Sequence, residues 1–324
     1  MPIQRRTLLA GAAAAAGIAV VPWAQAFPMR AVRIVVPYPA GGSIDVPARI
    51  LTEALPPLLG QPVIILNSPG GSAAIGTRAV AQAEADGHTL LMGTNQTHGS
   101  NPSLIPNLGY DPVKDFQCIA GIGRIQHALI VRKSLGITSL AELVALARKS
   151  PGKLTYASSG NASASHLAAE LFKKSAGVHI THIPYRGVAP AIQDLLGGHV
   201  DMSVATLPSV LSFARSGSIE VLGIASNERA AQLPDVKTLV EQGFPQTAAD
   251  AWAALFAPAK TPPETVVQLR QAVLTVFAQA ANAKKLTDAG YRLQIRTGED
   301  FSSFMREDMA RWDAVIKSSN IKLD

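Results

Sequence analysis

Small polar residues and glycines gather where several predicted strands end, and these residue types suit the binding of a small ligand. They occupy six loops, at residues 37–45, 67–72, 93–98, 158–163, 185–190 and 206–208. The loops are rich in Gly, Ser, Thr and Asn and almost empty of charged residues. Such loops bind an anion through backbone N–H groups and hydroxyls at helix N-termini. Each helix N-terminus carries the equivalent of about half a positive charge. The chemistry indicated is anion binding without ion pairing.

The usual catalytic and cofactor signatures are absent from the sequence. It contains no Gly-x-Ser-x-Gly, no Gly-x-x-x-x-Gly-Lys-Ser/Thr and no His-Glu-x-x-His. His179 and His182 are three residues apart in a predicted strand, so their side chains face opposite sides and share no metal. We therefore expect no catalytic residue, no metal site and no cofactor. The alternative is an exported α/β hydrolase-like enzyme that uses His166 with a serine of residues 158–163 for acyl transfer.

Strand-like and helix-like segments alternate along the chain and position these loops. Short β-branched runs occur at residues 32–36, 63–66, 89–92, 153–157, 179–183, 201–205 and 221–225. Ala- and Leu-rich segments with helical spacing follow them, for example at residues 189–196 and 207–215. This alternation predicts an α/β fold with mostly parallel sheets, in which ligands bind at the carboxyl ends of the strands.

Two capping patterns predict where further helices begin. Ser139 stands three residues before Glu142, and Thr261 stands three residues before Glu264 with Pro263 between them. A hydroxyl followed three residues later by a glutamate is the pattern of a capping box. We expect helices to begin after Ser139 and after Thr261, and a last amphipathic helix to follow residue 297.

The first 26 residues have the pattern of a cleaved export signal. Arg5 and Arg6 precede an uncharged apolar run at residues 8–21, and Ala24-Gln25-Ala26 is a small-x-small cleavage pattern. At 14 residues the run is shorter than the ~20 needed to span a bilayer as a helix. We predict cleavage after Ala26. The arginine pair fits a twin-arginine signal and an ordinary secretory signal equally.

The composition is that of a globular protein with a large core. The 324 residues are 48% hydrophobic and 16% charged, with a formal net charge of +6. Without Arg5 and Arg6, 27 basic residues face 23 acidic ones, a net charge of +4. This modest charge has no basic block and predicts no nucleic-acid binding. At this length two lobes are the default expectation.

A series of motifs runs along the chain in a fixed order. The first is Val-Val-Pro-Tyr-Pro-Ala-Gly-Gly-Ser-Ile-Asp at residues 35–45. Further motifs follow at residues 59–63, 85–91, 110–116, 151–158, 182–187, 194–201 and 233–236. This series resembles the Bug-type solute receptors of tripartite tricarboxylate transporters, and the resemblance covers essentially all of residues 28–324.

The resemblance implies a two-lobed periplasmic binding protein of type II-like fold. Each lobe would hold a mostly parallel sheet flanked by helices, with two crossover segments near residues 123–132 and 251–258. Lobe 1 would then comprise residues 27–124 and 252–324, and lobe 2 residues 125–251. The receptor would act in the periplasm, most simply as a monomer, and would close on a small carboxylate and deliver it to integral-membrane transporter subunits. A receptor that serves a sensor kinase is an alternative with the same sequence.

The resemblance also carries candidate ligand-binding residues onto this chain. From lobe 1 they are Tyr38, Pro39, Ala40, Gly41, Gly42, Asp45, Thr94 and Asn95; from lobe 2 they are Ser158, Ser159, Gly160, Ser163, His166 and Thr206. Asp45 has a competing role as the N-cap of the helix that follows it. For Tyr185 and Arg186, packing and a site role are equally compatible with the sequence.

Overall fold

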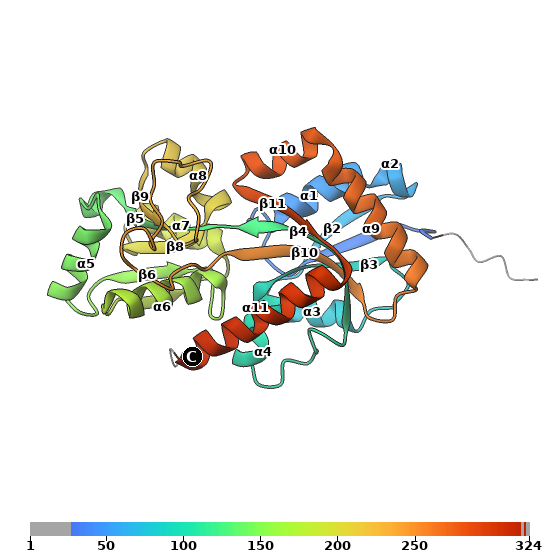
Figure 1. The fold of residues 1–324 in the computed structure, drawn as a ribbon, viewed down its shortest axis with the longest axis horizontal. Helices are drawn as coiled ribbons and strands as arrows, with labels where there is room; N and C mark the ends of the chain where they lie inside the picture. The colour runs from blue at the N-terminus through green and yellow to red at the C-terminus, as the bar shows by residue number, and fades with distance from the viewer. Residues whose placement is uncertain (1–26, 319–320, 322–324) are drawn as a thin grey trace, which may run out of the picture.

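The chain folds into two lobes, each built on its own β-sheet. We describe a computed structural model covering residues 27–318 and 321. One sheet has six strands in the order β11-β4-β10-β3-β1-β2, and the other has five in the order β7-β6-β8-β5-β9. Figure 1 shows the two sheets side by side along the long axis of the molecule, with helices around each. We call the six-stranded part lobe 1 and the five-stranded part lobe 2.

The sheet of lobe 1 combines a parallel half with an antiparallel half. β1 (Val32–Val36) lies between β2 (Val63–Asn67) and β3 (Thr89–Thr94) and is parallel to both. β10 (Ala251–Pro258) pairs antiparallel with β3 and with β4 (Phe116–Ile125). β11 (Tyr291–Arg296) completes the sheet antiparallel to β4.

The sheet of lobe 2 has the same mixed character. β6 (Thr155–Ser158) is parallel to β7 (Thr181–Pro184) and to β8 (Met202–Thr206). β5 (His127–Arg132) lies between β8 and β9 (Ile219–Ile224) and is antiparallel to both.

The expectation of mostly parallel sheets is therefore wrong, although the two lobes are present. Gln126 alone separates β4 in the sheet of lobe 1 from β5 in the sheet of lobe 2, so the chain enters lobe 2 along an extended path. It returns to the first sheet as β10. Strands that carry the chain between lobes run against the parallel strands built by βαβ units, and each sheet becomes mixed.

Helices cover the faces of both sheets. In lobe 1 they are α1 (Asp45–Ala54), α2 (Pro56–Leu59), α3 (Ala74–Ala81), α4 (Asn101–Leu104), α9 (Pro263–Ala278), α10 (Ala280–Asp288) and α11 (Gly298–Ser318). In lobe 2 they are α5 (Leu140–Lys149), α6 (Ala164–Ala176), α7 (Val188–Gly197) and α8 (Leu207–Arg215). Short π-helical and 3₁₀ turns lie at Gln96–Ser100 and Lys133–Leu135.

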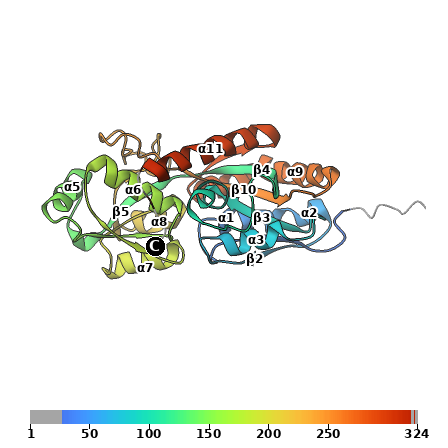
Figure 2. The same cartoon turned by 90° about the horizontal axis from the view of Figure 1, so that it is seen from below.

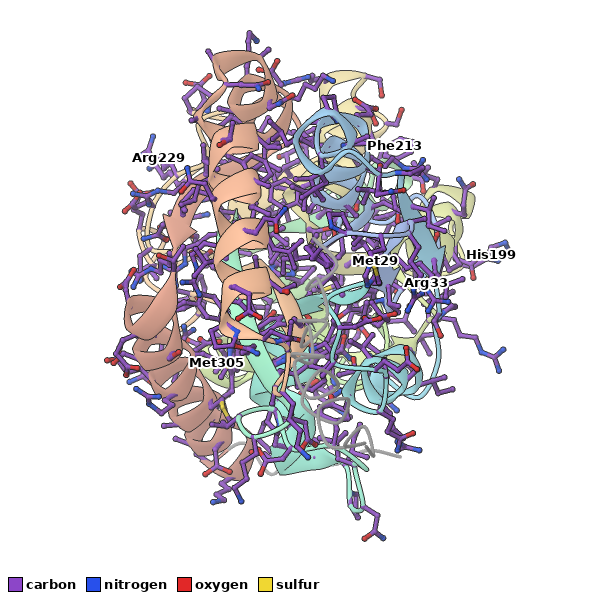
Figure 3. The ribbon with its side chains drawn as sticks, turned by 90° about the vertical axis from the view of Figure 1, so that its right-hand side faces the viewer. Met29, Arg33, His199, Phe213, Arg229 and Met305 are labelled. Carbon is purple, nitrogen blue, oxygen red and sulfur yellow. The ribbon has the colours of Figure 1, made fainter. Side chains whose placement is uncertain are left out.

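The C-terminal helix α11 packs against both lobes. Phe301 and Met305 join a lobe 1 cluster that includes Trp252, whereas Trp312 and Ile316 join the main core of lobe 2. Figure 2 shows α11 along one side of the molecule, across the junction of the lobes. Figure 3 labels Met305 on this helix, and charged Arg229 and exposed His199 on opposite sides of the molecule.

The three predicted helix starts are confirmed, at Leu140, Pro263 and Gly298, but one of the two predicted caps is wrong. Ser139 and Glu142 form the capping box expected before α5. Thr261 does not cap α9, because Pro262 occupies the cap position and no side chain bonds to the first turn.

The predicted signal peptide, residues 1–26, lies outside the described residues. Within residues 27–318 and 321, no helix is long and apolar enough to cross a membrane. The exact lobe boundaries stay a prediction.

Candidate functional site

A cavity of about 70 Å³ lies between the two lobes and receives the N-termini of helices from both. Ser43 and Ile44 reach it from the start of α1, and Ser163 and Ala164 from the start of α6. Residues 187–189 bring the start of α7, and Thr206 that of α8. Since a helix N-terminus carries about half a positive charge, this convergence favours an anion.

No Lys, Arg, Asp or Glu is among the described residues that line this inner cavity. The one histidine in the described lining is His127, whose pKa burial lowers to about 4, against the opposing effect of a hydrogen bond with the Ala249 backbone. His127 is therefore neutral at pH 7. An anion in this cavity would interact with helix dipoles, amides and hydroxyls, as the loop composition predicts.

Most of the predicted site residues meet at this cavity. Those that line it are Tyr38, Pro39, Ala40, Gly42, Thr94, Asn95, Ser159, Ser163 and Thr206. Gly160 lines an adjoining outer cavity of about 610 Å³. Gly41, Asp45, Ser158 and His166 line neither cavity.

The lobe 1 loop at residues 39–42 is held from behind by Asp45. The Asp45 carboxylate accepts hydrogen bonds from Gly41 N–H at 2.5 Å, Asn67 Nδ2 at 3.0 Å and Arg49 Nη2 at 3.1 Å. Gly41 has φ +78°, which favours glycine, whereas Gly42 carries no positive φ. Among the described residues, the hydrogen bonds of this loop do not use the N–H groups of Ala40 and Gly42.

The N-cap role expected for Asp45 is wrong. Ile44 occupies the cap position of α1, no side chain bonds there, and Asp45 is the first helical residue. Its carboxylate points back along the chain, because Gly41, Asn67 and Arg49 together offer it three donors. The Asp45 side chain is 2% exposed and lines no cavity, so it contacts the loop and not the ligand space.

Polar side chains after β3 form the lobe 1 wall of the cavity. The Tyr38 hydroxyl lies 2.7 Å from Thr94 Oγ1 and donates to Gln96 Oε1 at 3.1 Å. Burial raises the pKa of Tyr38 well above its usual value, so the phenol stays protonated. Asn95 is 1% exposed, and its Nδ2 has no hydrogen-bond partner among the described residues. A buried amide left unpaired costs about 1–3 kcal/mol, which a ligand acceptor would offset.

A cluster of serines forms the lobe 2 wall. Ser163 Oγ accepts from His166 N–H at 3.2 Å, which caps α6, and donates to Gly160 O at 2.6 Å. Ser165 Oγ lies 2.9 Å from both Ser159 Oγ and Ser163 Oγ, and it accepts from Ser159 N–H. The loop is thus preorganised with its hydroxyls at the N-terminus of α6.

Ser158 and His166 lie beneath this wall. Ser158 is fully buried, and its Oγ is 2.7 Å from Nε2 of His182, not from His166. The rings of His166 and His182 stack at 4.2 Å and 6°. Burial lowers the pKa of His182 to about 3, and the nearby Lys173 ammonium contributes. Ser158 and His182 therefore form a hydrogen-bonded pair that lines neither interlobe cavity.

Three of the hydrogen bonds that join the lobes reach the lobe 2 loop between β6 and α6. Ser72 Oγ donates to Asn161 O at 3.1 Å, and Gln96 Nε2 donates to the same carbonyl at 3.3 Å. Ser100 Oγ donates to Ala162 O at 2.9 Å. Their two acceptors are neighbouring carbonyls of that loop. The lobes are therefore in direct contact across the cleft in this structure.

Sequence reasoning missed the cavity residues near the lobe junction. Ile125, His127 and Ala251 line the inner cavity from β4, β5 and β10, none of which is predicted as a strand. Ser165 was also missed, although it lies only two residues beyond the polar loop at residues 158–163. Among the described residues, no three His, Cys, Asp or Glu side chains group as a metal site.

Comparison with known proteins gives one consistent family. Residues 47–321 match the model of the tripartite tricarboxylate transporter family receptor. The chain is 35% identical to Protein BugT of Bordetella pertussis over 96% of this chain and 95% of BugT. It resembles R. palustris Rpa4515, solved with adipate, with 34% identity and a TM-score of 0.89 over 92% of this chain and 100% of that one.

The two-lobed fold has the same support. The periplasmic binding protein BugD is 29% identical to this chain, with a TM-score of 0.87 over 92% of this chain and 100% of BugD. The resemblance seen in the sequence motifs and the two-lobed periplasmic binding protein fold are both confirmed. This chain belongs to the tripartite tricarboxylate transporter receptor family.

Proposed function

We propose that this protein is a receptor that binds a small carboxylate between its lobes and delivers it to integral-membrane transporter subunits. The observation that carries the proposal is the convergence of four helix N-termini on a cavity lined by no charged side chain among the described residues. A carboxylate matches this environment because its two oxygens accept several N–H and O–H donors at once. Rpa4515 has a similar fold and is solved with adipate, a dicarboxylate, and that ligand supports a carboxylate as the ligand here.

The contacts proposed for the carboxylate come from both walls. Ala40 and Gly42 N–H, with the Asn95 amide, would donate from lobe 1, and the hydroxyl of Ser159 from lobe 2. Ser163, whose hydroxyl donates to Gly160 O, would hold the lobe 2 loop beside the ligand. Tyr38, Pro39, Thr94 and Thr206 would shape the cavity around the ligand. Gly41, Asp45, Ser158 and His166 would act only by holding the two loops.

Closure of the lobes is the proposed capture step. Lobe 1 at residues 27–124 and 252–324 would rotate against lobe 2 at residues 125–251, and the cross-cleft bonds of Ser72, Gln96 and Ser100 would form. We further propose export to the periplasm with cleavage after Ala26, and action as a monomer. Family membership supports the compartment.

We also propose that the chain catalyses no reaction. Ser158 is fully buried and, like its partner His182, lines neither interlobe cavity. His166, the base of the hydrolase alternative, also lines neither cavity, and its ring lies 4.2 Å from that of His182. A nucleophile must reach its substrate within about 3–3.5 Å. Esterase and amidase probes should show no turnover; turnover that His166→Ala abolishes would support the enzyme instead.

The decisive experiment is a thermal-shift and calorimetric screen of the mature chain. The panel holds mono-, di- and tricarboxylates, each with its neutral amide as the matched control. A carboxylate at ~100 times its Kd adds about 2.7 kcal/mol to the free energy of unfolding, which raises the Tm by several degrees. The amides should give no shift. If no carboxylate stabilises the protein, or the amides bind equally well, the proposed function is wrong.

A further inference from the structure

We infer that His166 is a positioning residue: its neutral imidazole holds the lobe 2 loop in the conformation that closes the cleft. The inference rests on the proposed function and adds a residue that contacts no ligand. Nδ1 of His166 accepts the backbone N–H of Ala162 at 3.3 Å. Because a backbone N–H only donates, Nδ1 must be unprotonated, and the ring proton of the neutral form must lie on Nε2.

The loop needs this support because its backbone is unusual at Ala162. Ala162 has φ +63°, a left-handed conformation that costs a non-glycine residue about 1–2 kcal/mol. Its side chain is fully buried, and its N–H has His166 as the hydrogen-bond partner. Without that bond, a buried amide would be unpaired at a residue already in an unfavourable conformation.

The same residue carries a hydrogen bond across the cleft. Ala162 O accepts Ser100 Oγ of lobe 1 at 2.9 Å, and the neighbouring Asn161 O accepts both Ser72 and Gln96. The peptide group between Asn161 and Ala162 thus donates its N–H to His166 and accepts the lobe 1 donors at its carbonyl, and the next carbonyl, that of Ala162, also faces lobe 1. A change at His166 must therefore move the acceptors on which closure depends.

His182 keeps the His166 ring in place from the other side. The two rings stack almost parallel at 4.2 Å, and Tyr156 stacks on His182 at 4.7 Å. His182 Nε2 lies 2.7 Å from Ser158 Oγ, which in turn accepts Gly160 N–H at 3.2 Å. Both ends of the loop, at Ser158 and at Ala162, therefore bond to this imidazole pair.

The test compares variants that keep or lose the acceptor at the Nδ1 position. His166→Asn retains an oxygen near that position, whereas His166→Gln extends its amide toward the Nε2 position and His166→Leu has no acceptor. With adipate as the probe in calorimetry, we expect His166→Leu and His166→Gln to raise Kd about 5–10-fold and His166→Asn to stay within about twofold. His199→Leu, at an exposed histidine of the same lobe, is the control and should leave Kd unchanged.

A double-mutant cycle separates positioning from general destabilisation. If His166 acts through the Ala162 peptide on Ser100, then Ser100→Ala should weaken adipate binding clearly in the wild type and much less in His166→Leu. Additive losses from the two substitutions would overturn the inference, and so would a His166→Asn variant as weak as His166→Leu.

Two measurements need no ligand and so distinguish this inference from the proposed function. Nitrogen-15 NMR of the histidine side chains should show Nδ1 of His166 without a proton, and a protonated Nδ1 would overturn the inference. Hydrogen exchange at the Ala162 amide should be about tenfold faster in His166→Leu than in the wild type or His166→Asn. If adipate does not bind but these two results hold, the positioning role stands and the ligand class is wrong.

Discussion

The carboxylate of Asp45 accepts a hydrogen bond from the backbone N–H of Gly41 at 2.5 Å, and so fixes the lobe 1 loop from outside the cavity. The second oxygen accepts Asn67 Nδ2, which also donates to Tyr38 O at 3.0 Å. Asp45 therefore ties β2 and the start of α1 to the segment that lines the site. An acidic residue next to an anion site is unfavourable as a ligand contact, but its charge here is directed away from the cavity and toward N–H donors.

Asp45→Asn should weaken both folding and carboxylate binding. The amide places a donor against Gly41 N–H or Asn67 Nδ2, and a hydrogen bond to a charged group is worth about 1.5–3 kcal/mol. We expect a loss of about 2 kcal/mol in the free energy of unfolding by urea titration, and a several-fold rise in Kd. Arg49→Gln removes only the partly exposed ion pair and should cost at most about 1 kcal/mol. Equal effects of the two substitutions would contradict this role of Asp45.

Alanine substitutions at Gly41 and Gly42 should affect different properties, the stability of the fold at Gly41 and the affinity for the carboxylate at Gly42. A Cβ at Gly41 meets no atom within 4 Å, but φ +78° makes alanine cost about 1–2 kcal/mol. A Cβ at Gly42 lies 3.4 Å from Pro39 O on the cavity wall. Gly41→Ala should therefore lower the free energy of unfolding, and Gly42→Ala should raise the carboxylate Kd with little change in stability. Gly41→Asn, which tolerates left-handed backbone better, is the matched control.

The sequence predicts the parallel strands well and the antiparallel strands poorly. Residues 32–36 are β-branched and correspond to β1 as observed. β10 is buried at every position and rich in alanine, so it shows no alternation and no β preference. β4 contains Gly121 and Gly123, where a Cβ would lie 2.5 Å from the Phe301 ring and 2.6 Å from Arg292 O. Those glycines serve close packing, which a sequence pattern does not reveal.

The contrast between parallel and antiparallel strands also explains which residues of the candidate site the sequence predicts. Loops after parallel strands were found because the carboxyl ends of such strands meet at one edge of a sheet. His127 and Ile125 were missed because they lie on strands that join the lobes. Asp45 and His166 follow the correct loops in sequence, but their side chains turn behind those loops and not into the cavity. Spacing along a chain places a residue near a site without giving the direction of its side chain.

Buried neutral histidines should make the fold sensitive to mild acid. Burial lowers the pKa of His98 to about 3 and that of His127 to about 4, against about 6.5 in the unfolded chain. A depressed pKa contributes stability above pH 6.5 that is lost as pH falls toward the folded value, because the unfolded state takes up protons first. Between pH 7.5 and pH 5 each histidine should cost about 2 kcal/mol.

His98→Asn tests this pH dependence. The asparagine keeps an acceptor toward Thr97 Oγ1, which lies 2.8 Å from Nδ1 of His98, and has no group that titrates in this range. The variant is expected to be less stable overall but to lose about 2 kcal/mol less than the wild type between pH 7.5 and pH 5, measured by urea titration. His199→Asn, at an exposed position, should keep the wild-type slope. An unchanged slope in His98→Asn would show that His98 has the same pKa in the folded and unfolded states, and would contradict the prediction.

Arg186 should favour ligands with a second acidic group. Among the residues that the structure describes, Arg186 is the one charged residue that lines either interlobe cavity. It forms no ion pair with any other described residue. The outer cavity that it lines shares Tyr38, Gln96 and Gly187 with the inner one, so a longer ligand could extend from one into the other. An exposed ion pair contributes up to about 1 kcal/mol, or about fivefold in affinity.

Calorimetry with adipate and hexanoate, which have the same chain length, measures this preference. Arg186→Gln should raise the Kd of adipate by up to about fivefold and leave that of hexanoate unchanged, whereas Arg186→Lys should retain most of the preference because the positive charge remains. Arg215→Gln removes the same charge from the exposed end of α8 and controls for net charge. The effect in Arg186→Gln should shrink as salt rises, because an exposed pair is screened. A parallel loss for both acids would instead mean that Arg186 supports the fold of the loop and does not contact the distal group.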